Sequence, residues 1–417
     1  MSAPSEPPSR RPALAGHGIA ITGVGVVASC GLGREHLDAA FAAGTPTVQP
    51  IERLPGLPPR PGAGPAVASL VDGSDYGEWL SAREARRMSP PSRFAVVACR
   101  QALAGAGLGS AATTDPATGV VLATTYGAPS VTQALLDQLI AEGPEAMSPF
   151  HFMESVANAP AGQAAIRCRA SGPNHTLCQR EAGPLAALGR AAGEVDAGRA
   201  ERMLAGAVEE ITPLLYSALE RFGAVAPVAR PFDRRRGGLV PAEGATVFLV
   251  EGEAAARRRG ASPLARLAAW GGVFDPTASA VGWGVGGSVL AGTVARGMAR
   301  FGLTPADVDC VVSGASGSRG GDRLEAAVLR QLFGDSPPPI VAPKGVTGEY
   351  AGAWSAAGLT VLAGGPLAAT AGFEEADPEL AVTPHDGSPL GPVRRLLAIV
   401  LAVGGGGAWV ILERASP

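Results

Sequence analysis

The chain has 417 residues, 46% of them hydrophobic and 17% charged, a balance that suits a buried core spread over two or three domain-sized units. Its formal net charge of −3 excludes a broad basic surface, so no nucleic-acid partner is expected. The five cysteines form no CxxC pair, which favours free thiols in a reducing cytoplasm.

Two stretches bear on targeting. Residues 1–17 are rich in Ser, Pro and Arg and lack an apolar core, so we expect a disordered tail rather than a signal peptide. The longest uncharged run, 396–412, contains glycines at 404–407. A membrane helix needs about 20 apolar residues, so we interpret this run as a strand, a turn and a second strand. We expect no membrane partner and place the protein in the cytoplasm.

Strand and helix patterns alternate along the chain. Buried-strand patterns occur at 18–27, 119–123, 203–208, 246–251 and 310–313. Helical periodicity occurs at 34–43, 92–104, 160–169, 182–194, 288–301 and 323–333. Residues 45–75 read as a Pro- and Gly-rich surface loop, and Thr304, Pro305 and Asp307 are residue types that begin a helix. The alternation predicts a layered α/β fold with buried sheets, whose second half starts near residue 256.

Several motifs follow one another in a fixed order: 19–27, 84–88, 158–162, Gly172-Pro173, 203–210, 308–311, 343–348 and 404–407. The most specific stretch is RPFDRRRGGLVPAEGA at 230–245. Together they resemble the β-ketoacyl synthase family over residues 18–414. The resemblance implies a thiolase-like α/β fold of five α-β-α-β-α layers, built from two related halves, 18–255 and 256–417. It also implies dimers in which each subunit shapes the pocket of the other.

A ketosynthase of this family needs a cysteine nucleophile at a strand-to-helix turn, two histidines that stabilise an enolate oxygen, and a lysine that orients one of them. Counting from Gly172-Pro173 places Glu181 at the nucleophile position. Anchoring on Asp322 places Gly314 at the first histidine.

The second histidine should follow the family lysine by five residues. Lys344 is retained, and Glu349 stands in the histidine's place. Residues 404–407 replace the family's bulky gate. Since each lost oxyanion donor costs roughly 100- to 1000-fold in rate, we expect negligible condensation by this chain alone and assign it no catalytic residue.

Three other motifs contain residue types that occur in functional sites. Cys178 and His175 lie three residues apart on an incoming strand and should face opposite sides, so we reject them as a dyad. The glycines of 23–28 are similar to a dinucleotide fingerprint, which we also reject because such glycine turns are common. The run 234–236 favours a structural or carrier-docking surface over a nucleic-acid site. No metal-ligand cluster is visible.

Glu181 and Glu349 admit two interpretations. They could share a proton and act as acid and base. Alternatively, Glu181 caps a helix N-terminus and Glu349 pairs with Lys344 or an arginine. We favour the second interpretation.

The changed site and the whole-length, single-module layout are similar to the chain length factor of type II polyketide synthases, although Glu181 stands where that class usually has glutamine. We therefore expect a non-catalytic subunit that forms a heterodimer with an active ketosynthase in polyketide or aryl-polyene-like biosynthesis. No cofactor is expected, because acyl groups would arrive on a phosphopantetheinyl acyl carrier protein. A divergent decarboxylase or acyltransferase using Glu181 and Glu349 stays open as the alternative, and so does a catalytically dead homodimer.

Overall fold

Most of the strands form one continuous β-sheet in the computed structural model. The structure describes residues 18–72, 75–109 and 113–415. In sheet order they are β11 (Ile340–Val341), β10 (Cys310–Ser313), β12 (Arg395–Leu401), β13 (Gly406–Arg414), β9 (Ala265–Phe274), β1 (Ile19–Ala28), β8 (Gly244–Gly252), β7 (Arg202–Glu209), β5 (Thr118–Ala123) and β6 (Asn174–Leu177). Outside this order, β2 (Gly31–Leu32) pairs with β1, and β3 (Gln49–Pro50) pairs with β4 (Val67–Ala68). This sheet therefore contains strands from both halves of the chain.

The two halves meet where β1 and β9 pair antiparallel. The pairing is short, with Ala20 opposite Arg266 and Ile21 opposite Ala265. Beyond it β1 continues along β8, while β9 continues along β13. The two expected sheets therefore share one narrow junction and diverge from it.

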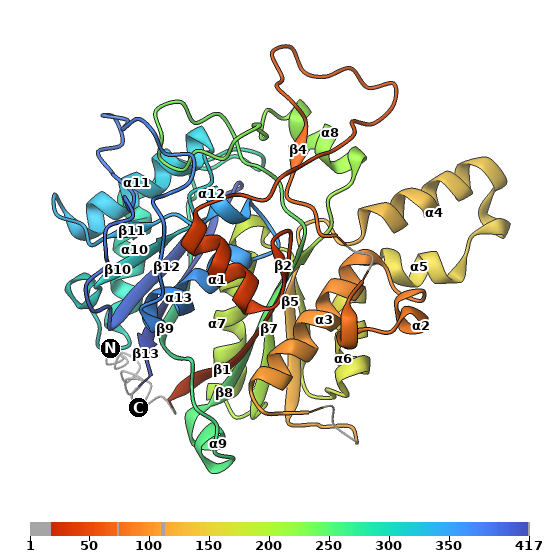
Figure 1. The fold of residues 1–417 in the computed structure, drawn as a ribbon, viewed down its shortest axis with the longest axis horizontal. Helices are drawn as coiled ribbons and strands as arrows, with labels where there is room; N and C mark the ends of the chain where they lie inside the picture. The colour runs from red at the N-terminus through yellow and green to blue at the C-terminus, as the bar shows by residue number, and fades with distance from the viewer. Residues whose placement is uncertain (1–17, 73–74, 110–112, 416–417) are drawn as a thin grey trace, which may run out of the picture.

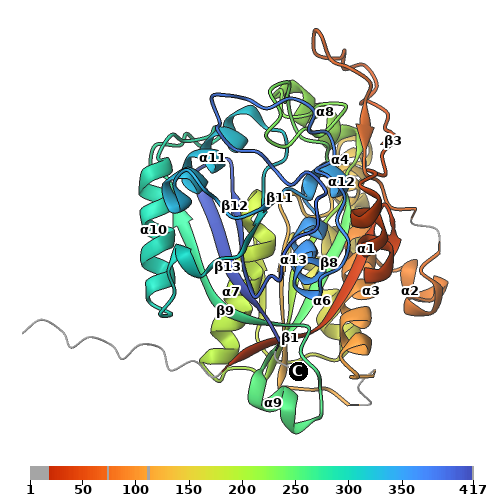
Figure 2. The ribbon, with the colours of Figure 1, turned by 60° about the vertical axis from the view of Figure 1, so that its left-hand side comes forward.

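Helices cover both outer faces and fill the space between the two sheets (Figures 1 and 2). The outer pairs are α3 (Pro90–Gly105) with α6 (Ala159–Cys168), and α10 (Gly287–Ala299) with α11 (Arg319–Phe333). Between the sheets lie α7 (Gly183–Asp196) and α13 (Ala357–Ala363). The largest apolar cluster combines residues of both sheets with residues of the helices between them, including Leu188 of α7. The predicted five-layered order is confirmed.

The remaining helices and 3₁₀ turns connect or flank these layers, and two of them, at 344–347 and 353–356, are buried. They are α1 (Arg34–Ala43), α2 (Ala82–Ala85), α4 (Pro129–Glu142), α5 (Pro149–Ser155), α8 (Pro213–Arg221), α9 (Glu253–Arg258) and α12 (Lys344–Thr347), with short 3₁₀ turns η1 (Gly77–Trp79), η2 (Pro144–Ala146), η3 (Arg180–Ala182), η4 (Pro305–Asp307) and η5 (Ala353–Ala356). Helices α4 and α5 form an arm that extends from the body (Figure 1). None of the helices in the described ranges has the length and apolarity needed to cross a membrane.

The glycines near the start of the chain serve packing, not a phosphate-binding turn. Gly23 and Gly25 lie inside β1, and a Cβ added there would lie 2.0 and 1.9 Å from the carbonyl oxygens of Ala102 and Ala98 on α3. Any side chain would push this helix away from the sheet. The glycines of 23–28 therefore have a packing role in this strand.

Most predicted elements are present with small shifts in their ends. The helix at 34–43 has the predicted bounds, and the run 396–412 is strand, turn and strand. The helix expected from Thr304 is wrong: its capping box forms, but only the three-residue η4 follows. The expected tail, 1–17, lies outside the described residues, and the boundary at 255/256 stays a prediction.

The central helix should dominate stability. Leu188→Ala removes a buried side chain packed between two sheets, and we expect a loss of about 2–5 kcal/mol in the free energy of unfolding. Ile140→Ala, on the exposed side of α4, should change it by less than about 0.5 kcal/mol. Urea unfolding followed by circular dichroism measures both, and equal losses would contradict the layered packing.

Candidate functional site

Glu181 lies in η3, at the turn that leads from β6 into α7. Its side chain is 5% exposed, and its Oε2 accepts a hydrogen bond from the backbone N–H of Val403 at 3.2 Å. Burial, followed by the negative charge of Glu349, raises the pKa of Glu181 to about 7. The expected helix cap is wrong, because no side chain caps η3 or α7. Glu181 instead fixes the turn that follows β12.

Lys344 and Glu349 form a buried ion pair at the ends of α12. The ammonium nitrogen lies 2.6 Å from Oε1 and 2.7 Å from Oε2 of Glu349, and the two residues are 0% and 2% exposed. The same ammonium lies 4.9 Å from the ring centroid of Trp354, a cation–π contact. The expected pairing of Glu349 with Lys344 is present. It commits the carboxylate to a cation and leaves no hydrogen bond between Glu349 and Glu181.

Gly314 leaves no room for a histidine. A Cβ at this position would lie 2.7 Å from Cβ of Val400 on β12. The backbone N–H of Gly314 donates to Glu325 at 3.0 Å, and the Ser313 hydroxyl donates to the same carboxylate. Burial raises the pKa of Glu325 to about 8. The turn is therefore packed as a structural element without an oxyanion donor.

Two tyrosines line the site together with Glu181. The hydroxyl of Tyr126 donates to that of Tyr350 at 2.9 Å, and their rings meet edge to face at 5.2 Å. Burial raises the pKa of both hydroxyls, and the charges of Glu181 and Glu349 add to the shift. Tyr350 has a left-handed backbone (φ 76°), a strained conformation for a bulky residue. Sequence reasoning missed this pair, whose only signal was an aromatic residue directly after Glu349.

Arg180 joins three segments around Glu181. Its Nη1 donates to the carbonyl oxygens of Ala280 and Val403, both at 3.0 Å. The turn after Val403 begins with Gly404 and Gly405, whose φ values of 89° and 92° favour glycine. Sequence reasoning located this glycine turn in place of the bulky gate, but it missed Arg180, which ties the turn to the site.

A cavity of about 680 Å³ opens beside Glu181. Leu215, Leu219 and Leu239 form an apolar wall, and Arg180 lies at the polar end. Val281 and Trp283 from the loop after β9 also line it. The cavity is apolar enough to hold an acyl chain, but its carboxylate cannot form the thioester intermediate that a cysteine forms.

The rejected dyad is not assembled. Cys178 is exposed and lines the cavity, whereas His175 contacts Glu194 on α7 at 3.2 Å through Nε2. Arg190 and Arg199 contact the same carboxylate. His175 is therefore part of a structural ion-pair cluster.

The layered fold, the turn that carries Glu181 and the Lys344 turn define a ketosynthase-type protein. The chain belongs to the β-ketoacyl synthase family: the family's N-terminal domain matches residues 17–256 and its C-terminal domain residues 285–364. This finding agrees with the resemblance derived from the motifs.

Individual relatives cover nearly the whole chain. It is 32% identical to a protein of Streptomyces coelicolor named polyketide β-ketoacyl synthase 2, over 94% of each chain. It is 30% identical to the tetracenomycin polyketide synthase ketoacyl synthase beta subunit of Streptomyces glaucescens, over 80% of this chain and 82% of the relative. The solved ishigamide ketosynthase/chain length factor superposes with a TM-score of 0.86 at 26% identity, over 96% of this chain and 100% of the other.

Removing the cation alone should destabilise the site strongly. Lys344→Met leaves Glu349 buried without its partner, and we expect a loss of about 3–5 kcal/mol in the free energy of unfolding. Lys344→Met combined with Glu349→Met should recover most of it. Arg234→Met, which breaks the exposed pair with Glu375, should cost about 1 kcal/mol or less. Urea titrations measure all three variants. If Lys344→Met costs no more than Arg234→Met, the buried pair does not have the role assigned to it.

The raised pKa of Glu181 predicts a pH-dependent stability. The folded state binds this proton up to about pH 7, whereas an unfolded glutamate releases it near its ordinary pKa of 4.5. The contribution of Glu181 to the free energy of unfolding is therefore fully present below pH 4.5. It is lost as the pH rises through 7, and the loss is roughly 3 kcal/mol at most. The melting temperature of Glu181→Gln should rise relative to the unmodified chain between pH 5 and pH 8.5. The exposed Glu142→Gln serves as control, and parallel profiles for all three proteins would refute the assignment.

Proposed function

We propose that this chain is a non-condensing partner subunit of the chain-length-factor type, which forms a heterodimer with an active ketosynthase in polyketide or aryl-polyene-like biosynthesis. The observation that carries the proposal is the buried ion pair between Lys344 and Glu349. It fills the place where the second histidine of an active ketosynthase would act. With Glu181 and Gly314 at the other two positions, the cavity keeps its walls but lacks the nucleophile and both oxyanion donors.

The relatives support the subunit role. One is named as a beta subunit, and the superposed structure is named as a ketosynthase/chain length factor. A beta subunit works beside another ketosynthase chain. In the same arrangement, the partner of this chain carries out the condensation, and both subunits shape the shared pocket.

The surface that such a partner would cover lies around β6. This strand ends the sheet, and its outer edge has no strand beside it in the described ranges, so it can pair with another chain. The neighbouring arm exposes the apolar side chains Leu136, Ile140, Phe152 and Met153, and Ile166 of the adjoining α6 is exposed as well. An open edge beside an apolar face is the combination that a partner subunit stabilises.

In this proposal the acyl chain arrives on a phosphopantetheinyl acyl carrier protein that docks on the active partner. The cavity beside Glu181 contributes to the space available to the growing chain. The alternative, a decarboxylase or acyltransferase using Glu181, draws on one observation: a pKa near 7 lets this carboxyl exchange a proton at neutral pH. Against it, Glu349 is held by Lys344 and cannot act as the second member of the pair.

Co-expression with a cysteine-bearing ketosynthase from the same gene neighbourhood tests the proposal. We expect a 1:1 complex by size-exclusion chromatography and a product from malonyl carrier protein only when this chain is present. Glu181→Gln should leave product formation within about twofold, because this carboxylate does no chemistry in the proposed role. A homodimer that ignores the partner, with turnover that disappears in Glu181→Gln, would refute the proposal.

The interface has its own matched variants in the same experiment. Met153→Asp places a charge on the apolar arm and should abolish the complex. Val289→Asp places the same charge at an exposed position of α10, away from the arm, and should leave the complex intact. A complex that survives Met153→Asp unchanged would place the partner elsewhere.

A further inference from the structure

Two of the five cysteines are in contact in the core beneath the outer helices. Cys99 lies in α3, and Cys168 is the last residue of α6, which packs on α3. Both belong to the same apolar cluster, and they are 0% and 9% exposed. Their side chains are joined by a hydrogen bond, which Cys99 donates to the sulfur of Cys168. No hydrogen bond joins any other two of the cysteines, all of which lie in the described ranges.

The contact makes the two thiols chemically unequal. The hydrogen bond to Cys168, together with burial, holds the pKa of Cys99 well above its ordinary range. The same bond lowers the pKa of Cys168 against the opposing effect of burial, and the charge of Arg100 adds to the lowering. Since the thiolate and not the thiol is the nucleophile, Cys168 is the member that can attack an oxidant, and Cys99 is placed to attack Cys168 afterwards.

A recess of about 740 Å³ gives small molecules a route to the end of α6. Its wall includes Arg167 and Arg169, which flank Cys168 in the chain, and Arg100, which follows Cys99. Solvent therefore reaches the residues on both sides of Cys168. A small oxidant in the recess needs only a local movement of the last turn of α6 to reach the sulfur, and helix ends open more readily than helix centres.

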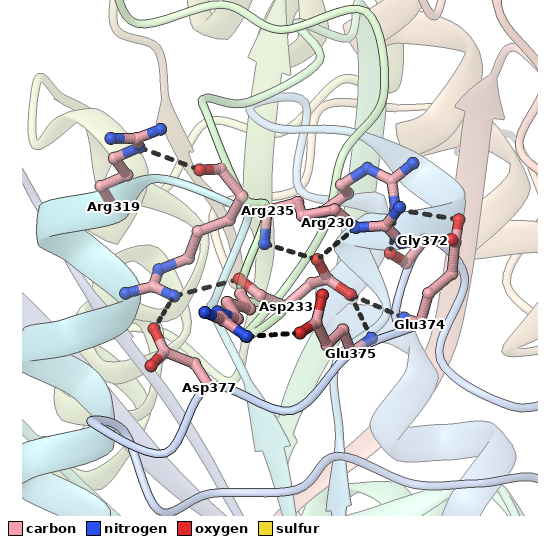
Figure 3. A network of polar contacts seen from close by, with 10 residues as sticks. Arg230, Asp233, Arg235, Arg319, Gly372, Glu374, Glu375 and Asp377 are labelled. Carbon is pink, nitrogen blue, oxygen red and sulfur yellow. Dashed lines mark hydrogen bonds and ion pairs between the residues drawn. The ribbon is translucent and has the colours of Figure 1, made fainter.

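The arginines at this recess differ from the larger arginine cluster of the chain. In that cluster the run 234–236 pairs with acidic residues of the segment 374–377 (Figure 3), which supports the structural interpretation of the run. By contrast, no carboxylate among the described residues lies within 4.0 Å of Arg167 or Arg169, and the buried Nε of Arg167 has no hydrogen-bond partner there. Unpaired cations beside Cys168 favour its thiolate.

We propose that Cys99 and Cys168 form a redox modification site, which a hydroperoxide converts into a disulfide between α3 and α6. The Cys168 thiolate attacks one peroxide oxygen, so an S–O bond forms as the O–O bond breaks, and the leaving oxygen takes a proton from solvent. The Cys99 sulfur then attacks the sulfenic sulfur, an S–S bond forms, and the hydroxyl leaves as water with the Cys99 proton. The two thiols lose two electrons, which the hydroperoxide gains.

The disulfide would close a loop around the arm. Helices α4 and α5, which form the arm, lie between the two cysteines in the sequence, and α3 and α6 carry the ends of this loop. A covalent link at that point keeps α6 on α3 when the end of α6 opens, and it restricts the unfolded chain. Oxidation should therefore stabilise the base of the arm.

The inference does not rest on the proposed function, because the bond can form in the purified chain without a partner. A failure of heterodimer formation would leave it standing, and a failure of disulfide formation would leave the proposed function standing.

Peroxide oxidation of the full-length Cys178→Ala chain tests the site, because this background lacks the exposed thiol and keeps the other four. We expect hydrogen peroxide to remove two of these thiols, counted in denaturant, and dithiothreitol to restore them. Mass spectrometry of an unreduced digest should find Cys99 joined to Cys168, and the melting temperature should rise by a few degrees. No loss of thiols, a loss without a disulfide, or a bond to Cys30 or Cys310 would overturn the proposal.

Single variants in the same background separate the two roles. Cys99→Ala should leave Cys168 as a sulfenic acid that dimedone traps, with no disulfide and no rise in melting temperature. Cys168→Ala should leave Cys99 unoxidised, at least 10-fold less labelled by dimedone than Cys168 in Cys99→Ala. Cys30→Ala, which removes a half-buried thiol elsewhere, is the matched control and should still form the bond. Equal labelling of Cys99 in Cys168→Ala would overturn the assignment, and the thiol count above decides the proposal even where a buried variant fails to fold.

Discussion

The buried ion pair between Lys344 and Glu349 is the interaction on which the site depends. Lys344 is the one lysine in the sequence, and moving an ammonium and a carboxylate out of water costs several kcal/mol for each ion. Contacts at 2.6 and 2.7 Å and the face of Trp354 offset that cost. The same contacts fix α12 and η5 against each other. A histidine at position 349 would be free to donate to a substrate oxygen, whereas the glutamate is an acceptor already held by Lys344. The pair that stabilises the site is therefore also the contact that supports the proposed loss of condensation.

Glu209 and Glu325 are buried carboxylates with structural roles in which backbone N–H groups replace water. Glu209, whose pKa burial raises to about 8, accepts from the N–H groups of Thr125 and Tyr126 and so positions the tyrosine pair. Glu325 does the same for the turn at Gly314. Glu181 differs, because its carboxyl, which accepts from the backbone N–H of Val403, also lines an open cavity. Proton uptake near neutral pH is therefore most accessible at Glu181, although the surrounding groups supply no partner for catalysis.

Sequence reasoning succeeded where the deciding contacts are local. The ends of α1 follow from Gly33 and Gly44, and the pairing of Lys344 with Glu349 spans five residues. It failed where tertiary packing decides. Thr304 forms its capping box, yet the chain must enter buried β10 only six residues later, so no full helix fits. The partners of Glu181 and Tyr350, which are Val403 and Tyr126, lie 222 and 224 residues away, and no local pattern announces them. Register counting thus located the site but could not predict its contacts.

The loss of condensation proposed for this chain would leave its pocket intact, because the pocket wall and the condensing positions are formed by different residues. The cavity walls come from α8 and the loop after β9, whereas the chemistry of an active ketosynthase would come from three turns, at Glu181, Gly314 and Glu349. Changes at the three turns leave the apolar wall at Leu215 and Leu219 intact. Gly314 packs closely against Val400, and Glu349 is paired with Lys344. Both contacts support the proposal of a subunit that shapes and holds an acyl chain.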